Sequence, residues 1–312
     1  MKAVQVAEFG VEHVTVAEAA DPHPGQGEVL IATEAATINP ADFAVATGAV
    51  AARLPWGSAP PYTPGWDLAG RVVAAGEGVD GSVIGSRVVG FSLWFESLRG
   101  TQAALVALPV GNVVPAPDGL AAVQLTTVGL NGLTAWRGLA DLKLAEGETL
   151  VITGATGSVG GFAAELAAAR GFTVIAVVRE DQKQDALALG AAAVVSAPDA
   201  EIGAAVRQIV PGGADALLDS ASIAGPALSA VRDGGKYVTV TAVPPAERGI
   251  DVFRSGGRMD ATALSTLADM ATSGRLHTPV AHSFRVEDAR AAYQAFAKRA
   301  GRGRLVLTFP GA

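Results

Sequence analysis

The chain has 312 residues, of which 50% are hydrophobic and 17% are charged, and its formal net charge is −7. This length exceeds that of one ordinary core and predicts two domains, while the negative charge and the lack of any Lys/Arg run exclude a nucleic-acid partner. Cysteine is absent, which excludes disulfides, thiolate nucleophiles and zinc sites built on cysteine.

The first 120 residues predict a β-rich domain. Short runs rich in Val, Ile, Thr and Ala alternate with Gly, Pro and Asp, which is typical of strands joined by turns. Strands at this spacing indicate a β-barrel-like domain rather than a parallel sheet. The predicted strands cover residues 1–8, 12–17, 28–38, 67–75, 87–91 and 102–108.

Residues 121–260 predict a second domain in which strands and helices alternate. Such alternation indicates right-handed crossovers and a parallel sheet, and the nearly uninterrupted apolar strands are typical of a sheet that is covered on both faces. The predicted strands cover 149–153, 173–178, 193–195, 216–218 and 236–240. The predicted helices cover 121–139, 158–170, 181–189, 201–210 and 226–231.

The last segment, residues 261–312, predicts a helix, a strand, a helix and a strand over 261–273, 278–284, 286–298 and 304–309. We expect it to return to the first domain and complete it.

A glycine-rich turn joins the strand at 149–153 to the helix that follows. Ala155, Gly157 and Gly160 hold the three places where a dinucleotide-binding turn needs small residues. The helix would point its free N–H groups and the positive end of its dipole at a diphosphate. A tight turn that binds nothing is the alternative, and the flanking βαβ pattern favours binding. The predicted cofactor-binding residues here are Gly154, Ala155, Thr156, Gly157, Ser158, Val159 and Gly160.

The residue after the second strand of this domain distinguishes the two nicotinamide cofactors. An acidic residue there would bind a free 2′-hydroxyl, but this chain has Arg179, which suits the 2′-phosphate of NADPH. Lys183 is a second candidate. In the alternative, Arg179 is a solvated loop residue and Glu180 or Asp181 faces the ribose. We predict NADPH.

Four segments carry a family resemblance: Ile38-Asn39-Pro40-Ala41-Asp42, Pro64 to Gly70, Gly132-Leu133-Thr134-Ala135-Trp136, and Gly301 to Leu307. In this order and spacing the chain resembles the medium-chain dehydrogenase/reductase superfamily, in its zinc-lacking quinone oxidoreductase (zeta-crystallin-like) branch. The resemblance implies an α/β fold with a GroES-like β-barrel catalytic domain and a Rossmann domain built on a doubly wound parallel sheet. It also implies a cleft that holds the nicotinamide, and a homodimer.

The resemblance also suggests roles for single residues. Asn39 and Thr134 lie where family members contact the nicotinamide and substrate; alternatively, Asn39 forms a turn with Pro40 and Thr134 bonds within its helix. Asp42 and Asp67 are expected to bond nearby backbone N–H groups. A loop that passes the nicotinamide would contain Thr241, Ala242 and Val243.

Three departures from the family pattern bear on these assignments. A tyrosine that helps to hold the 2′-phosphate is replaced by Ser196-Ala197, the stretch from 179 to 189 is about one residue short, and Gln102 and Ala104 replace an aromatic residue and a Glu. The first two weaken the prediction of NADPH. Asn39 and Trp66 occupy places where zinc-containing relatives have ligands, so we predict no metal.

Without a metal, the acceptor must already be electrophilic, which predicts hydride transfer to a small apolar quinone or α,β-unsaturated carbonyl. A dedicated enoyl or enone reductase of a biosynthetic pathway is one alternative, and a non-enzymic NADPH-binding structural or sensor protein is another. Five aromatic residues form either a substrate wall or core: Trp56, Tyr62, Phe91, Trp94 and Phe95. The N-terminus does not resemble a signal peptide and the apolar runs are short, so we expect a cytoplasmic protein with no membrane partner.

Overall fold

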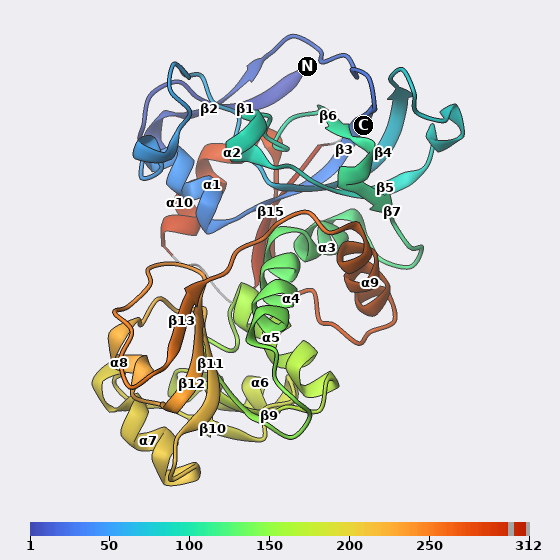
Figure 1. The fold of residues 1–312 in the computed structure, drawn as a ribbon. Coiled ribbons are helices and arrows are strands. Elements are labelled where there is room, and N and C mark those ends of the chain that lie inside the picture. Colours follow the sequence, from blue (N-terminus) through green and yellow to red (C-terminus); the bar gives the residue numbers. More distant parts are fainter. Residues whose placement is uncertain (299–302, 310–312) are drawn as a thin grey trace. The chain divides into compact units, whose positions relative to one another are not determined.

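The computed structural model describes residues 1–298 and 303–309 and divides the chain into two compact units (Figure 1). The first unit is Met1–Leu130 with Met259–Ala312, and the second is Asn131–Arg258. The predicted boundary after residue 120 is therefore about ten residues too early. The reason is that α3 (Ala122–Leu125) packs on strands of the first unit. The second boundary falls two residues before the predicted one.

The first unit is built on a seven-stranded sheet with the order β14-β15-β3-β4-β5-β7, and β6 pairs with β3 off this path. The longest strand, β3, pairs antiparallel with β4, β6 and β15, so the last segment of the chain does return to complete this unit. The strands of this sheet are β3 (Glu28–Ile38), β4 (Asp67–Ala75), β5 (Arg87–Phe91), β6 (Leu105–Pro109), β7 (Val113–Pro115), β14 (Val280–Arg285) and β15 (Arg304–Thr308). Two further strands, β1 (Lys2–Val6) and β2 (Val14–Glu18), form a separate antiparallel pair.

Helices of the first unit pack against its strands. On one side a core of Val, Ile, Leu and Ala side chains from β1, β3 and β15 packs against α10, where Tyr293 is fully buried. The remaining helices are α1 (Pro40–Thr47), α2 (Trp94–Ser97), α9 (Ala261–Thr272) and α10 (Ala289–Ala297).

The second unit contains a six-stranded, all-parallel sheet with the order β10-β9-β8-β11-β12-β13. Consecutive residues of β8 such as Leu150, Val151 and Ile152 are all fully buried, and since they point to opposite faces, both faces are covered. The strands are β8 (Thr149–Thr153), β9 (Thr173–Val177), β10 (Ala193–Val195), β11 (Ala214–Asp219), β12 (Val231–Thr239) and β13 (Asp251–Arg254). The helices are α4 (Leu130–Leu142), α5 (Ser158–Ala169), α6 (Lys183–Ala188), α7 (Ile202–Ile209) and α8 (Gly225–Leu228).

This strand order confirms the doubly wound prediction. The order runs outward from β8 through β9 and β10 on one side, and from β11 to β13 on the other. Ligands of such sheets bind outside the carboxyl ends of the strands, at the point where the order reverses. That point lies between β8 and β11, which end at Thr153 and Asp219.

Several elements differ from the sequence predictions. The helix predicted over 121–139 is interrupted at Gly129 (ψ −100°), where the Cα lies against Asp67. Helix α1 and the short strands β7 and β13 were not predicted, and the strand predicted at 102–108 begins only at Leu105. In the part of the chain that the structure describes, no helix combines the length and apolar character that a membrane crossing needs. Gly301 and Arg302, part of the last resemblance segment, lie outside the described residues.

Candidate active site

The glycine turn closes on itself between β8 and α5. Gly154 has a φ of 60°, in the left-handed region where glycine carries no steric penalty. Its N–H donates to the Val177 carbonyl (2.9 Å), and its own carbonyl accepts the Gly157 N–H (2.8 Å). These bonds turn the chain sharply from the end of β8 into α5.

The three small residues of the turn serve different purposes. A Cβ on Gly160 would lie 2.2 Å from the Gly154 oxygen and 2.7 Å from Ser220 Oγ, so only glycine fits there. Ala155 is fully buried, and its methyl group belongs to the core. Gly157 is exposed and precedes α5 without a side chain to cap it. The N-cap Gly157 makes no side-chain hydrogen bond to the first turn of α5, and a helix N-terminus that begins in this way can bind a phosphate through its backbone N–H groups.

A second loop, which sequence reasoning missed, lies beside this turn. Asp219, fully buried at the end of β11, accepts hydrogen bonds from Thr153 Oγ1 (2.6 Å), Tyr237 Oη (2.7 Å) and the N–H groups of residues 221, 223 and 224. It holds the loop in an unusual shape, since Ser222 and Ala224 have φ values of 63° and 59°. Such strain in non-glycine residues occurs at functional sites.

This loop forms one side of the glycine turn. Ser220 Oγ donates to the Thr153 carbonyl (2.6 Å), and a Cβ on Gly154 would lie 3.2 Å from that of Ala221. Burial and then the Asp219 charge raise the pKa of Tyr237, so its hydroxyl stays a donor. The sequence does contain a signal for this loop, since two largely apolar strands each end in a polar residue, Thr153 and Asp219.

The two predicted phosphate-binding cations are exposed and already paired. Arg179 Nε lies 3.4 Å from Asp181 Oδ1, and both side chains are more than 70% exposed. Lys183 Nζ lies 2.7 Å from Glu180 Oε1, and this hydrogen bond is the main cause of the lowered pKa of Glu180. The four charges cancel, so a 2′-phosphate would have to replace a carboxylate.

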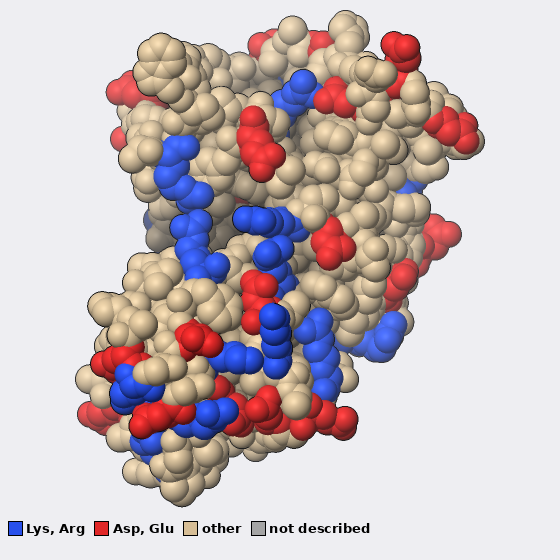
Figure 2. All heavy atoms as spheres, viewed as in Figure 1, with Lys and Arg blue, Asp and Glu red and all other residues tan. Residues whose placement is uncertain are grey.

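Charges elsewhere on the second unit are similarly mixed. Arg232 pairs with Asp215, and Arg248 pairs with Asp233. Figure 2 shows basic and acidic side chains intermixed towards the lower end of this unit. An anionic ligand would therefore be recognised by local contacts.

The remaining predicted residues of this unit are placed as follows. Thr241, Ala242 and Val243 are exposed just beyond β12, and the Thr241 N–H donates to Thr239 Oγ1 (3.1 Å). Thr134 lies on α4 and is 6% exposed. The turn and Arg179 follow the neighbouring strands β8 and β9, so the predicted diphosphate and ribose residues share one edge of the sheet.

Asn39 of the first unit lies in a buried cluster with two aspartates. Asn39 precedes α1 and is 1% exposed; its N–H donates to Asp42 Oδ2 (2.7 Å), and its Nδ2 donates to Asp67 Oδ2 (3.2 Å). Asp67 Oδ2 also accepts the Leu130 N–H (3.1 Å). The expected bonds from Asp42 and Asp67 to backbone N–H groups are thus present.

Burial dominates the electrostatics of this cluster. It raises the pKa of Asp42 well above the ordinary range, and the charge of Asp67 adds to the effect. Burial also raises the pKa of Asp67 to about 6, against the lowering effect of bonds from the Leu130 N–H and Asn39. Neither aspartate forms an ion pair with Lys, Arg or His among residues 1–298 and 303–309.

Most of the five aromatic residues belong to the core. Tyr62, Phe91 and Trp94 are at most 5% exposed, so they contribute packing rather than a free substrate wall. Trp56 is fully exposed, and Phe95 lies under the Arg53 guanidinium, 4.2 Å from its ring centroid.

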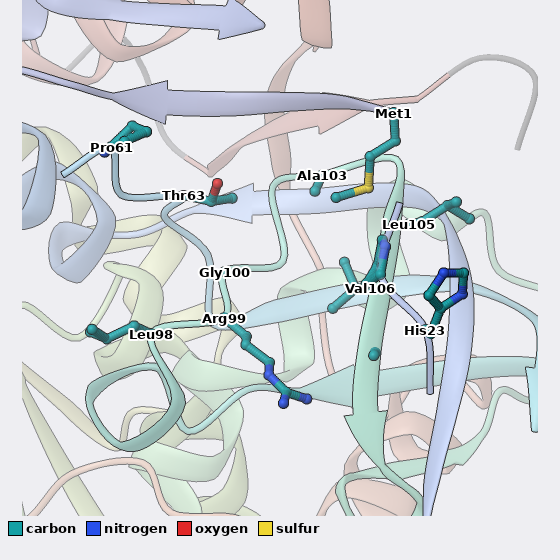
Figure 3. A pocket seen from close by; sticks show the side chains of 12 residues that line it. Met1, His23, Pro61, Thr63, Leu98, Arg99, Gly100, Ala103, Leu105 and Val106 are labelled. Carbon is teal, nitrogen blue, oxygen red and sulfur yellow. The ribbon is translucent and has the colours of Figure 1, made fainter. Parts of the chain in front are cut away.

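A separate pocket of about 390 Å³ lies in the first unit, lined by Met1, His23 and Arg99 among others (Figure 3). Arg99 is paired with Glu28. None of the predicted site residues lines this pocket, so it has no part in the site described above.

Two family models match the chain. The alcohol dehydrogenase GroES-like domain matches residues 25–118, and the zinc-binding dehydrogenase model matches residues 158–267. The chain belongs to the medium-chain dehydrogenase/reductase superfamily. Members of this superfamily are oxidoreductases that bind a nicotinamide cofactor.

The proteins to which this chain is similar are named for different activities. A mycocerosic acid synthase-like polyketide synthase of Mycobacterium tuberculosis is 33% identical over 224 residues, 70% of this chain, but the match spans only 10% of that synthase. The quinone oxidoreductase of Rattus norvegicus is 31% identical over 185 residues, 58% of this chain and 54% of the relative. The structure of a mycobacterial quinone oxidoreductase has a TM-score of 0.84 and 25% identity, covering 99% of this chain and 100% of that one.

The residues of this superfamily member do not fit the zinc that one model's description implies. At the ligand-like places, Asn39 donates to a carboxylate and Trp66 packs on Trp94 with ring centroids 5.2 Å apart. The chain contains no cysteine. Within the described ranges, no three His, Asp or Glu side chains come together as a metal site would require.

Proposed function

We propose that the protein is an NADPH-dependent, metal-independent reductase that transfers hydride to a quinone or an α,β-unsaturated carbonyl, in the zinc-lacking branch of its superfamily. The observation that carries this proposal is that two loops lie side by side where the strand order of the parallel sheet reverses. There the glycine turn, with its obligatory Gly160, lies beside the strained Asp219–Ala224 loop.

The residues of the turn fit a dinucleotide. The first N–H groups of α5 would donate to the diphosphate, and the exposed Gly157 lets a ligand approach the backbone. The Asp219–Ala224 loop would form the other wall of the nucleotide-binding site. When bound, the reduced nicotinamide supplies the hydride.

The acceptor follows from the groups that are present. A reductase that works without a metal, as we propose here, needs an acceptor that is itself electron-poor, as quinones and enones are. We assign to Asn39 and Thr134 the contacts with the acceptor or the nicotinamide. No exposed acid is required, since an enolate or hydroquinone anion can take its proton from water.

The preference for NADPH rests on a balance of two interactions. An exposed ion pair such as Arg179–Asp181 contributes at most about 1 kcal/mol. A charged hydrogen bond to a phosphate contributes about 1.5–3 kcal/mol. Replacement of Asp181 by the 2′-phosphate as the partner of Arg179 is therefore favourable. The same reasoning applies to Lys183 and its partner Glu180.

A second candidate function is an enoyl reductase of a biosynthetic pathway. It is favoured by the 33% identity to a polyketide synthase, although the chain spans only a tenth of that protein. It would show strong preference for one enone and no activity with quinones. A non-enzymic NADPH-binding protein would instead show a cofactor-dependent rise in melting temperature without turnover.

We also propose a homodimer joined through the second unit. Strand β13 ends the order of the six-stranded sheet, with β12 on one side only. An exposed edge of this kind favours pairing with another chain. Light scattering coupled to size exclusion would give a mass near 63 kDa, twice the 31.3 kDa of one chain, and a single-chain mass would refute the dimer.

The experiment that tests the proposed function is NADPH oxidation by the purified protein with a panel of quinones and enones, in buffer treated with a chelator. Turnover with several quinones supports the proposal. Turnover with one enone alone favours the second candidate. Absence of turnover with every acceptor refutes both.

A further inference from the structure

Asn39 is held by Asp42 of α1 and by a carboxylate on a neighbouring strand. Asp67 begins β4, and its Oδ2 accepts the Asn39 Nδ2 at 3.2 Å and the Leu130 N–H at 3.1 Å. Asn39 and Asp67 are 1% and 0% exposed. This interaction therefore joins the start of α1 to β4 inside the first unit, away from solvent.

Asp67 itself has little freedom to move. Its carbonyl accepts the Thr101 hydroxyl (2.8 Å), and its backbone pairs with Phe91 of β5. On the side of α4, a Cβ on Gly129 would lie 2.4 Å from Asp67 Cβ, so only a glycine allows this approach. The backbone and Cβ of Asp67 are thus held by three contacts, and these limit where its carboxylate can lie.

A fixed carboxylate determines which end of a carboxamide faces it. The two ends of the Asn39 side chain have nearly the same shape, but only the nitrogen donates. An ionised carboxylate accepts hydrogen bonds and gives none, so the reversed amide would place oxygen against oxygen. Nδ2 is therefore directed at Asp67 and Oδ1 lies on the opposite side of the amide group.

We propose that Asp67 is a positioning residue that fixes the orientation of the Asn39 carboxamide for the reduction of the acceptor. This inference rests on the proposed function, in which Asn39 contacts the acceptor or the nicotinamide. Asp67 touches neither of them and acts only through Asn39. An Asp67→Asn variant keeps the shape of the side chain, and the Leu130 N–H would still hold an oxygen towards Asn39, but that oxygen belongs to a neutral amide and forms a weaker hydrogen bond with the Asn39 amide.

The groups that face Asp67 define its pH dependence. Asp42 of α1 is the titratable neighbour, and the pKa of Tyr293 of α10 is raised by burial and then by the charge of Asp42. Leu130 contributes an N–H to Asp67, and Thr37 also faces its carboxylate. Burial brings the pKa of Asp67 to about 6. The hydrogen bond to Asn39 should therefore weaken as the pH falls through 6, when the carboxylate becomes protonated.

Kinetics of Asn39→Ala, Asp67→Asn and the double variant test the proposal. In the wild-type background, Asp67→Asn should lower kcat about 5- to 10-fold, the difference between a charged and a neutral hydrogen bond, and leave KM for NADPH unchanged. In the Asn39→Ala background the same change should have no further effect on kcat. The fall in wild-type kcat below pH 6 should be absent in Asp67→Asn. Equal losses in both backgrounds, or wild-type kcat in Asp67→Asn, would overturn the proposal.

A spectroscopic measurement separates this inference from the proposed function. The chain contains three asparagines, Asn39, Asn112 and Asn131, so selective ¹⁵N labelling gives three side-chain amide signals, and Asn39→Gln identifies the one of interest. Its chemical shift should titrate near pH 6 in the wild type and not in Asp67→Asn. No titration overturns the positioning role, even in an active enzyme. Titration in a protein that turns over no acceptor instead refutes the proposed function and the reaction role assigned here to Asp67.

Discussion

Replacement of Arg179 by Ala should change the cofactor preference and leave the fold intact. The Arg179 side chain is 75% exposed and its pair with Asp181 is 3.4 Å long, so its loss costs at most about 1 kcal/mol of unfolding free energy. Loss of a charged hydrogen bond to the 2′-phosphate costs about 1.5–3 kcal/mol. NADPH should therefore bind roughly 10- to 150-fold more weakly, whereas the Kd for NADH should be unchanged.

Titrations that follow nucleotide fluorescence, at one ionic strength, measure both constants. Lys143→Ala is the matched control, because it removes one positive charge from an exposed residue that precedes β8, at the end of the strand opposite the glycine turn. It should leave the Kd ratio unchanged. If Arg179→Ala binds both nucleotides as the wild type does, or if the wild type prefers NADH, the assignment of the 2′-phosphate site is refuted.

Three further predictions concern the turn, the buried acid and the strained loop. Gly160→Ala should abolish nucleotide binding, since its Cβ would lie 2.7 Å from Ser220 Oγ, and detectable binding at millimolar nucleotide would contradict this. The pKa of Asp67 is higher in the folded protein, so its contribution to stability is present below pH 3.8 and is lost as the pH rises through about 6. Asp67 should contribute about 3 kcal/mol to the loss of unfolding free energy across this range, and denaturant unfolding of Asp67→Asn should lack this part while the part due to Asp42 remains; equal curves would refute it. Tyr237→Phe removes the 2.7 Å bond to Asp219 and should lower the unfolding free energy by about 1.5–3 kcal/mol and weaken NADPH binding; unchanged binding would show that the loop does not depend on this bond.

The parallel sheet could be predicted because its strands carry a local signal. Uninterrupted apolar runs such as 150–152 identify strands that are buried on both faces, and the strand at 193–195 was predicted with its observed bounds. The glycine turn has a local signal as well, since Gly154 and Gly157 lie between β8 and α5.

Features that depend on long-range contacts were missed. Asp219 acquires its role only because β11 pairs with β8, which brings it within 2.6 Å of a residue 66 positions away. Asn39-Pro40 has the composition of a turn and instead begins α1, because Asp42 accepts the Asn39 N–H. The burial of Trp94 beside the exposure of Trp56 follows from packing, which the sequence pattern alone does not specify.

Hydrogen–deuterium exchange with and without saturating NADPH tests the central claim most directly, because it locates the bound nucleotide on the backbone. The account predicts protection of the amides of residues 154–160 and 220–224 upon binding, with Gly160→Ala showing none. Binding without protection of these two segments, or no binding at millimolar NADPH or NADH, would contradict it.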